Sequence, residues 1–304
     1  MSIKEPLKRT FQRPFIKFVC FFFEMLFDGK ESYDYNISSI DSTTVEISFS
    51  EDGSLKGRIP SSGERGKMAN LRIKAPFFEI GPKSYLYGDD VLKLAIAADE
   101  ASEKFGVDII FTTPVVDIRR VKEATKHIHV FAPHMDPLYP GRGLADTLPE
   151  SLVAAGAEGV MLNHCEKPLD RETLERTMRR ADEVGLTTIV CADSCKDARE
   201  IAEFHADIIV AEPSELIGTG ISVGPEYVEA ATRAVKDVAP ETLVLTAAGI
   251  HDGQDVYNTI IAGADATGSS SGIAGIKTEE GRNAMIEEML SALRRAWDER
   301  HPEE

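Results

Sequence analysis

The sequence has few cysteines, a single tryptophan and far fewer basic than acidic residues. Among its 304 residues, 34 Lys and Arg stand against 51 Asp and Glu, which gives a net charge of −17. Nucleic-acid-binding domains usually carry a basic patch or stripe, so this balance argues against nucleic acid as a partner. An acidic protein can still hold a locally positive pocket, so a small anionic substrate stays open.

The four cysteines lack the spacing of a disulfide framework. Cys191 and Cys195 lie close together in CADSC, but no second pair of Cys or His at ligand spacing accompanies them. We therefore expect free thiols in a reducing cytoplasm, and no metal site.

Long hydrophobic runs are also missing. The most hydrophobic window, PFIKFVCFFFEMLF, has about 14 residues and contains Lys17 and Glu24, which makes it too short and too charged for a transmembrane helix. It also lacks the small-residue cleavage site of a secretory signal. No membrane association is expected; a membrane-surface or partner-binding role for this segment is the alternative.

Residues 1–67 differ in character from the rest of the chain. A Ser-rich stretch could form a weak hairpin with its turn at EDGS, and SSGERGK has the composition of a linker before Met68. We expect residues 1–67 to be an N-terminal extension, poorly ordered or an artefact of the assigned gene start. Residues 68–304 should form a self-sufficient domain.

From Met68 onward, strands and helices alternate. Val/Ile-rich runs such as VDIIFTT and ADIIVAE predict buried parallel strands, each followed by apolar residues at helical spacing. Eight such units in about 235 residues match the α/β class and the (β/α)8 barrel, whose usual length is about 250 residues. The first strand is expected in LRIKAP. An open doubly wound sheet is disfavoured because no Gly-rich nucleotide-binding turn follows that strand.

Barrels of this kind carry their chemistry at the carboxyl ends of the strands. Those positions hold Lys74 after strand 1, Asn163, His164 and Glu166 after strand 4, Glu212 after strand 6, Gly249 after strand 7, and Ser270 and Ser271 after strand 8. The loops TAAGI and GSSSG follow strands 7 and 8, where such barrels bind phosphate through backbone N–H groups.

Glu212 ends a strand that is expected to be buried. Desolvation would raise the pKa of its carboxyl, which suits a general base. The following PSELIGTG can close over the site, with Pro213 stiffening one end and Gly218 and Gly220 freeing the other. With His164 as a hydrogen-bond donor and Lys74 as a cation, the set suggests proton transfer between adjacent carbons of a phosphorylated sugar.

These motifs resemble the triosephosphate isomerase family, particularly its shorter archaeal-type branch. LNHCEKPL is similar to the family's histidine motif, and AEPSELIGTG resembles its base-and-lid motif. The resemblance covers residues 68–297. It implies a cytoplasmic enzyme of glycolysis and gluconeogenesis that interconverts dihydroxyacetone phosphate and D-glyceraldehyde 3-phosphate, uses no cofactor and forms a homodimer or homotetramer.

The resemblance also implies the role of each matched residue. Glu212 would be the base, His164 the neutral electrophile and Lys74 the electrostatic partner; the pairing of a glutamate base with a neutral histidine is the family's established arrangement. Glu166 matches the acid that follows the histidine. Phosphate would bind at Gly218, Gly249, Ser270 and Ser271.

Two departures from the family stand out. Its first strand usually reads Asn-x-Lys, where this chain has Arg72-Ile73-Lys74, and its third loop usually carries Thr-Gly, where this chain has Leu144 and Ala145. An Arg72–Glu166 pair could replace the contacts that are lost. An isomerase of a longer ketose phosphate, such as a tetrulose phosphate, is the alternative activity, and a non-catalytic phosphosugar-binding barrel is the alternative class.

Overall fold

The computed structural model describes residues 9–11, 35–36, 40–41, 44–49 and 73–302. The chain divides into two compact units, Met1–Lys67 and Met68–Glu304. In the first unit, the described backbone forms four short strands: β1 (Arg9–Phe11), β2 (Tyr35–Asn36), β3 (Ile40–Asp41) and β4 (Thr44–Phe49). Strand β4 pairs antiparallel with each of the others. The predicted turn at EDGS and the linker SSGERGK lie outside the described residues.

The second unit is a closed barrel of parallel strands, as predicted. Neighbours pair in the order β10-β11-β12-β5-β6-β7-β8-β9. The strands are β5 (Phe77–Ile80), β6 (Asp108–Thr112), β7 (Ile128–Ala132), β8 (Gly159–Leu162), β9 (Thr187–Ala192), β10 (Ile208–Ala211), β11 (Leu243–Thr246) and β12 (Ala266–Gly268). Each is short and rich in Val, Ile, Phe or Ala, as expected for strands that are covered on both faces.

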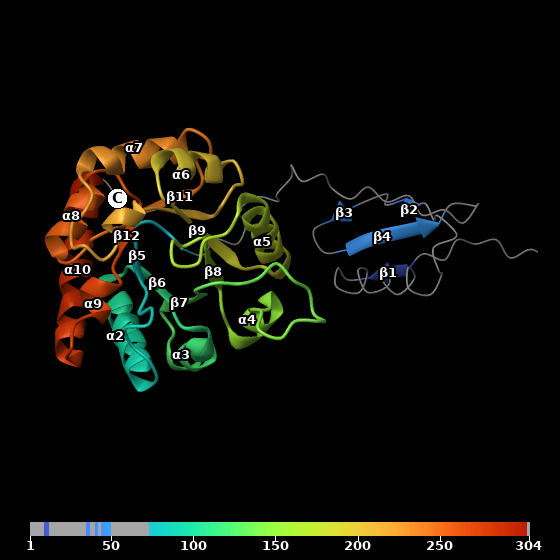
Figure 1. The fold of residues 1–304 in the computed structure, drawn as a ribbon, viewed down its shortest axis with the longest axis horizontal. Helices are drawn as coiled ribbons and strands as arrows, with labels where there is room; N and C mark the ends of the chain where they lie inside the picture. The colour runs from blue at the N-terminus through green and yellow to red at the C-terminus, as the bar shows by residue number, and fades with distance from the viewer. Residues whose placement is uncertain (1–8, 12–34, 37–39, 42–43, 50–72, 303–304) are drawn as a thin grey trace, which may run out of the picture. The chain divides into compact units, whose positions relative to one another are not determined.

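Helices connect the strands and lie around the barrel (Figure 1). They are α2 (Asp89–Phe105), α3 (Ile118–Ala124), α4 (Pro149–Ala155), α5 (Arg171–Val184), α6 (Cys195–Ala202), α7 (Pro225–Lys236), α8 (Gly253–Ile261), α9 (Ser271–Ala274) and α10 (Glu279–Arg300), with the 3-10 turns η1 (Val115–Asp117) and η2 (Ser214–Leu216). Several begin with side-chain caps; Asp170, for instance, accepts a hydrogen bond from the Thr173 N–H, as its sequence position predicts.

The first barrel strand is not where the sequence placed it. LRIKAP was expected to form it, but the strand is FFEI, Phe77–Ile80. Lys74 is exposed, and its N–H donates to Asp108 Oδ2 at 2.8 Å, at the start of β6. Lys74 therefore lies at the amino end of the barrel. All four residues of FFEI are buried, a position that Lys74 could not take without burying its charge.

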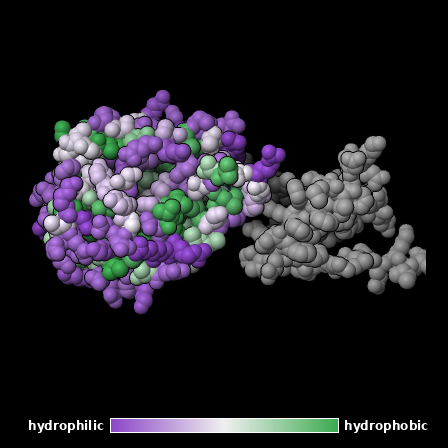
Figure 2. All heavy atoms as spheres, turned by 60° about the horizontal axis from the view of Figure 1, so that its bottom comes forward, coloured by the Kyte–Doolittle hydropathy of each residue, from purple (hydrophilic) through white to green (hydrophobic). Residues whose placement is uncertain are grey.

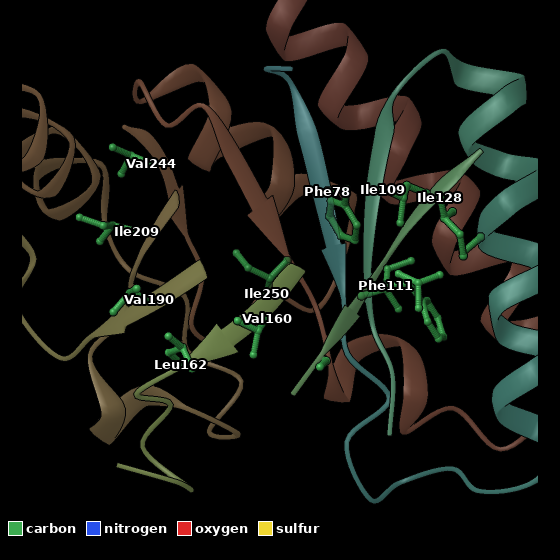
Figure 3. Packing of buried hydrophobic residues seen from close by; sticks show 14 of the residues in the cluster. Phe78, Ile109, Phe111, Ile128, Val160, Leu162, Val190, Ile209, Val244 and Ile250 are labelled. Carbon is green, nitrogen blue, oxygen red and sulfur yellow. The ribbon is translucent and has the colours of Figure 1, made fainter. Parts of the chain in front are cut away.

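Two hydrophobic clusters hold the barrel together. One fills the space between strands and helices; it includes Phe78, Ile109 and Val190, which Figure 3 shows beside the strands that carry them. The other fills the barrel interior and includes Phe77 and Ile110. Alternate residues of a strand thus enter alternate clusters, as the twofold repeat of a strand requires.

The surface of the barrel unit is largely hydrophilic on the face that Figure 2 shows, with separate hydrophobic patches. Among the described residues, no helix is long and apolar enough to cross a membrane.

Candidate active site

A cavity of about 590 Å³ lies at the carboxyl ends of the barrel strands. Its walls combine strand residues such as Met161 and Val210 with the loops that follow the strands. Seven of the predicted site residues line it: His164, Glu166, Glu212, Gly218, Gly249, Ser270 and Ser271. Arg72 lies outside the described residues.

Lys74 does not belong to this site, because it lies at the amino end of β5. Two lysines line the cavity, Lys83 and Lys167, and neither was expected there from the sequence. Lys83 follows β5 by three residues, and its charge acts on the pKa of both His164 and Glu212. The signal was present in the sequence, because GPKS follows the apolar run FFEI, but the first strand was expected earlier, in LRIKAP.

Glu166 has a partner other than the one proposed from the sequence. Its Oε1 lies 3.3 Å from Lys83 Nζ, and the carboxylate is otherwise largely exposed. Arg72 lies outside the described residues, so the Arg72–Glu166 pair expected from the sequence stays a prediction.

The loop after β8 is pinned by Asn163. This residue has a positive φ of 58°, a conformation that asparagine tolerates better than most residues. Its Nδ2 donates to the Cys191 carbonyl at 2.9 Å, and its Oδ1 accepts from the Leu169 N–H at 3.0 Å. Both ends of the amide are thereby used to fix the neighbouring His164 at the cavity wall.

His164 is held as a neutral hydrogen-bond donor. The backbone N–H of Glu166 donates to its Nδ1 at 3.1 Å, so a neutral ring carries its proton on Nε2. Burial lowers the pKa of His164, and the nearby Lys83 charge lowers it further, against smaller opposite effects of Glu166 and Asp193. The imidazole is therefore uncharged at neutral pH, with Nε2–H free to donate.

Glu212 directly follows β10 and continues its pairing, since its N–H donates to the Ala192 carbonyl at 3.0 Å. The side chain is partly buried. Desolvation raises the pKa of its carboxyl, while Lys83 and a hydrogen bond from the Ala248 backbone lower it. The result is a carboxylate with a raised pKa at the cavity wall, as a general base requires.

The loop after Glu212 has the form of a lid. It runs through Pro213 and η2 to Gly218 and Gly220, which have φ angles of 73° and 77°. Its far end packs on the loop after β11: a Cβ at Gly249 would lie 2.2 Å from the Ile221 carbonyl oxygen. Only glycine fits there, because φ at Gly249 is also positive.

The loops after β11 and β12 pack against each other. Ser269 Oγ donates to the Ile250 carbonyl at 2.8 Å, and a Cβ at Gly272 would collide with both Ser269 Oγ and the Ile250 oxygen. Ser270 and Ser271 stand at the start of α9. Small residues of both loops thus line the cavity, and such residues let an anion come close to backbone N–H groups.

Three further residues were not singled out from the sequence as part of the site. Glu79, on β5, and Thr112, on β6, are buried side chains of the cavity wall, and Gly81 stands between Glu79 and Lys83. His134 also lines the cavity, with its Nε2 3.1 Å from Asp136 Oδ1. The third-loop Leu144 is fully exposed, at 103%.

The described cysteines Cys165, Cys191 and Cys195 are free thiols. Burial raises the pKa of all three thiols, so none is activated as a nucleophile. Within residues 73–302 and the described strands of the first unit, no group of three or more His, Cys, Asp or Glu could hold a metal ion.

Comparison with known proteins gives one consistent family. The model of the triosephosphate isomerase family matches residues 83–289. Triosephosphate isomerase of Methanopyrus kandleri is 36% identical over 227 residues, which cover 73% of this chain and 99% of that protein. The enzyme of Saccharolobus solfataricus is 32% identical over 226 residues, covering 73% and 98%. That of Methanocaldococcus jannaschii is 35% identical over 196 residues, covering 64% and 89%. These relatives are archaeal.

Proposed function

Because the chain belongs to the triosephosphate isomerase family, we propose that it interconverts dihydroxyacetone phosphate and D-glyceraldehyde 3-phosphate. The observation that carries the proposal is the convergence of Glu212, His164 and Lys83 on one cavity beside two small-residue loops. A base, a neutral donor and a cation around an anion site are the parts that a sugar-phosphate isomerase needs.

Glu212 moves the proton. In the ketose-to-aldose direction, its carboxylate removes a proton from carbon 1, and the electron pair passes to the carbonyl oxygen on carbon 2, forming an enediolate. A proton also shifts between the two oxygens, and Glu212 then returns its proton to carbon 2. One carbon is oxidised while its neighbour is reduced, so the reaction needs no external oxidant or reductant.

His164 and Lys83 stabilise the charge that develops on the oxygens. The Nε2–H of His164 donates to them, because its Nδ1 is already occupied by the Glu166 N–H. Lys83 supplies positive charge. The pairing of a glutamate base with a neutral histidine is the family's established arrangement rather than a new result.

The loops after β11 and β12 bind the phosphate group. Backbone N–H groups around Gly249, Ser270 and Ser271 face the cavity, and Gly218 adds to them when the lid closes. Closure removes water from Glu212 and strengthens the electrostatic interactions inside the site. This accounts for a base placed at the hinge of a movable loop.

A side-by-side isomerase assay of the full chain on glyceraldehyde 3-phosphate and on tetrulose phosphates tests the proposal. Efficient triose turnover is expected. Preferred turnover of the tetrulose phosphates would replace it with the longer-substrate isomerase, for which Glu79 offers an extra polar group in the wall. Activity on neither, with phosphate binding retained, would indicate a non-catalytic binding barrel.

We also propose that the chain is a homo-oligomer, dimeric or tetrameric. Apolar side chains are exposed in the loops after the adjacent strands β5, β6 and β7: Tyr85, Val116, Tyr139 and Leu144. Exposed apolar side chains gathered in neighbouring loops are typical of a protein–protein interface. Leu144→Glu should reduce the mass measured by light scattering, whereas the control Ile261→Glu, at the end of α8, should not.

A further inference from the structure

Glu79 is a buried carboxyl group that the proposed reaction does not use. It is 8% exposed and belongs to β5, whose Phe77 enters the interior cluster while Phe78 and Ile80 enter the outer one. The alternation of the strand therefore directs Glu79 into the barrel, one layer above Phe77. There it forms part of the cavity wall.

The structure makes room for this carboxyl with two glycines. A Cβ at Gly81 would lie 3.1 Å from Glu79 Oε1 and 3.3 Å from Ser270 Oγ. A Cβ at Gly268 would lie 3.2 Å from Oε2 and 2.9 Å from the Glu79 Cβ. The carboxyl and Ser270 thus face the same small space, next to the proposed phosphate loops.

Within residues 73–302, the Glu79 carboxyl has no ion pair, and its hydrogen-bonding neighbour is the Thr112 hydroxyl on the adjacent strand β6, which lowers the pKa of the carboxyl. Their geometry falls short of a full hydrogen bond, so Thr112 Oγ1 is without a partner there. Buried polar groups left unpaired are costly, and in a cavity wall they point to a missing ligand.

We propose that Glu79 is a substrate-contacting residue, a neutral carboxylic acid whose O–H donates a hydrogen bond to an oxygen of the bound sugar phosphate. The inference rests on the proposed function for the identity of that ligand. The contact would help decide which phosphorylated sugars the site accepts. A neutral acid forms a hydrogen bond with an oxygen at that position, whereas an apolar group there would leave the acid O–H without a partner.

The charges around Glu79 support this protonation state. Burial raises its pKa to about 7, and Glu212 raises it as well, while Thr112 and Lys83 lower it. The other titratable groups of the cavity wall are Tyr85 after β5, His134 after β7, His164, Glu166 and Lys167 after β8, and Cys191 on β9. The wall of β12 contributes only Gly268 and the serines after it.

A bound phosphate dianion would add negative charge beside Glu79 and raise its pKa further. Glu212 differs, since it accepts a hydrogen bond from the Ala248 backbone and lies closer to solvent. The two carboxyls can therefore have different roles. Glu212 is ionised and acts as the base, and Glu79 is protonated and acts as a hydrogen-bond donor.

Sulfate tests the inference, because it stays a dianion from pH 6 to pH 9. Calorimetric titration of the full chain in two buffers of different ionisation enthalpy should show uptake of close to one proton per sulfate at pH 8. The dissociation constant should rise by up to tenfold per pH unit above the pKa of Glu79. Glu79→Gln, which keeps a donor, should bind without this pH dependence, and Glu79→Met should bind more weakly at every pH.

The same pH dependence in Glu79→Gln as in the parent protein would overturn the inference. Glu212→Gln controls for the second carboxyl and should keep the proton uptake. In turnover, Glu79→Met should raise KM more than it lowers kcat, and Glu79→Gln should partly restore KM. An equal KM in the parent protein, Glu79→Met and Glu79→Gln would also overturn the inference. If the parent protein fails to turn over triose phosphate but takes up the proton, the proposed function fails and the role of Glu79 stands.

Discussion

Lys83 Nζ lies 3.3 Å from Glu166 Oε1, an ion pair that joins the loop after β5 to the loop after β8 at the cavity wall. We expect Lys83→Met to lower kcat/KM by about 10²–10³-fold, because one preorganised charge at the developing oxyanion is lost. Steady-state kinetics of the purified variant measure this. The matched control is Lys74→Met, which removes an exposed lysine at the amino end of β5 and should leave activity unchanged.

The same pair contributes little to stability. The Glu166 side chain is 63% exposed, and such ion pairs contribute at most about 1 kcal/mol. Thermal melts of Lys83→Met and the parent protein should therefore nearly coincide. A large activity loss in Lys74→Met with little in Lys83→Met would restore the original assignment from the sequence.

Glu212→Gln should lower kcat by about 10²–10⁴-fold, because the amide cannot accept the carbon-bound proton. Anion binding should persist, which separates loss of the base from unfolding. In the parent protein, kcat/KM should fall as the pH falls through the raised pKa of Glu212, since only the ionised form is the base. This acid limb lies above the ordinary pKa of 4.5.

Lys83→Met should shift that limb. Lys83 is the strongest of the groups that lower the pKa of Glu212, so removing its charge should move the acid limb to higher pH. A pH–rate profile of the variant's residual activity measures the shift. An unmoved limb would mean that Lys83 does not act on Glu212 in the free enzyme.

Much of this fold could be predicted from the sequence because most strands are continuous apolar runs. VDIIFTT, ADIIVAE and their counterparts predict β6 to β12, and all of these strands are confirmed. The first strand was misplaced for a physical reason. LRIKAP and FFEI both contain charged residues, so apolar character did not separate them, and only the closed barrel brings Gly81 and Gly268 against Glu79.

The candidate site was predictable where a residue follows a recognisable strand within two positions. Glu212 and His164 meet that condition. Lys83 lies three residues beyond its strand in an irregular loop, and no periodic signal specifies where such a loop points its side chains. Because the first strand was expected in LRIKAP, Lys74 was assigned as the lysine at its carboxyl end.

Asn163→Gly should show how His164 is positioned. Glycine keeps the positive φ of 58° but removes the bonds to the Cys191 carbonyl and the Leu169 N–H. We expect a loss of about 1–3 kcal/mol in the free energy of unfolding. The rate should fall about tenfold or more, because a small displacement of a catalytic group is costly. Unchanged kcat alongside reduced stability would limit Asn163 to a structural role.

Gly249→Ala tests the contact between the lid and the loop after β11. The added Cβ would lie 2.2 Å from the Ile221 carbonyl oxygen, so the lid end must move, and KM should rise. Gly106→Ala is the control, with a similar φ of 61° but nothing within 4 Å of its Cβ. Gly106→Ala should lower the free energy of unfolding by about 1–2 kcal/mol, because it introduces backbone strain alone, at the end of α2. Equal effects of the two substitutions on KM would exclude the contact as the cause.

The pH dependence of stability should identify Glu79 independently of any ligand. Its pKa is about 7 when folded and 4.5 in the reference state. Because the folded pKa is raised, this group's contribution to stability is fully present below pH 4.5 and is lost as the pH rises through 7. The loss amounts to about 3 kcal/mol by pH 8. The free energy of unfolding of Glu79→Gln, measured in urea relative to the parent protein, should therefore increase by about that amount between pH 4.5 and pH 8. The control is Glu229→Gln, which replaces an exposed acid on α7 and should show no such increase. If the free energy of unfolding of Glu79→Gln relative to the parent protein also stayed constant with pH, Glu79 would be ionised at little cost in the folded protein.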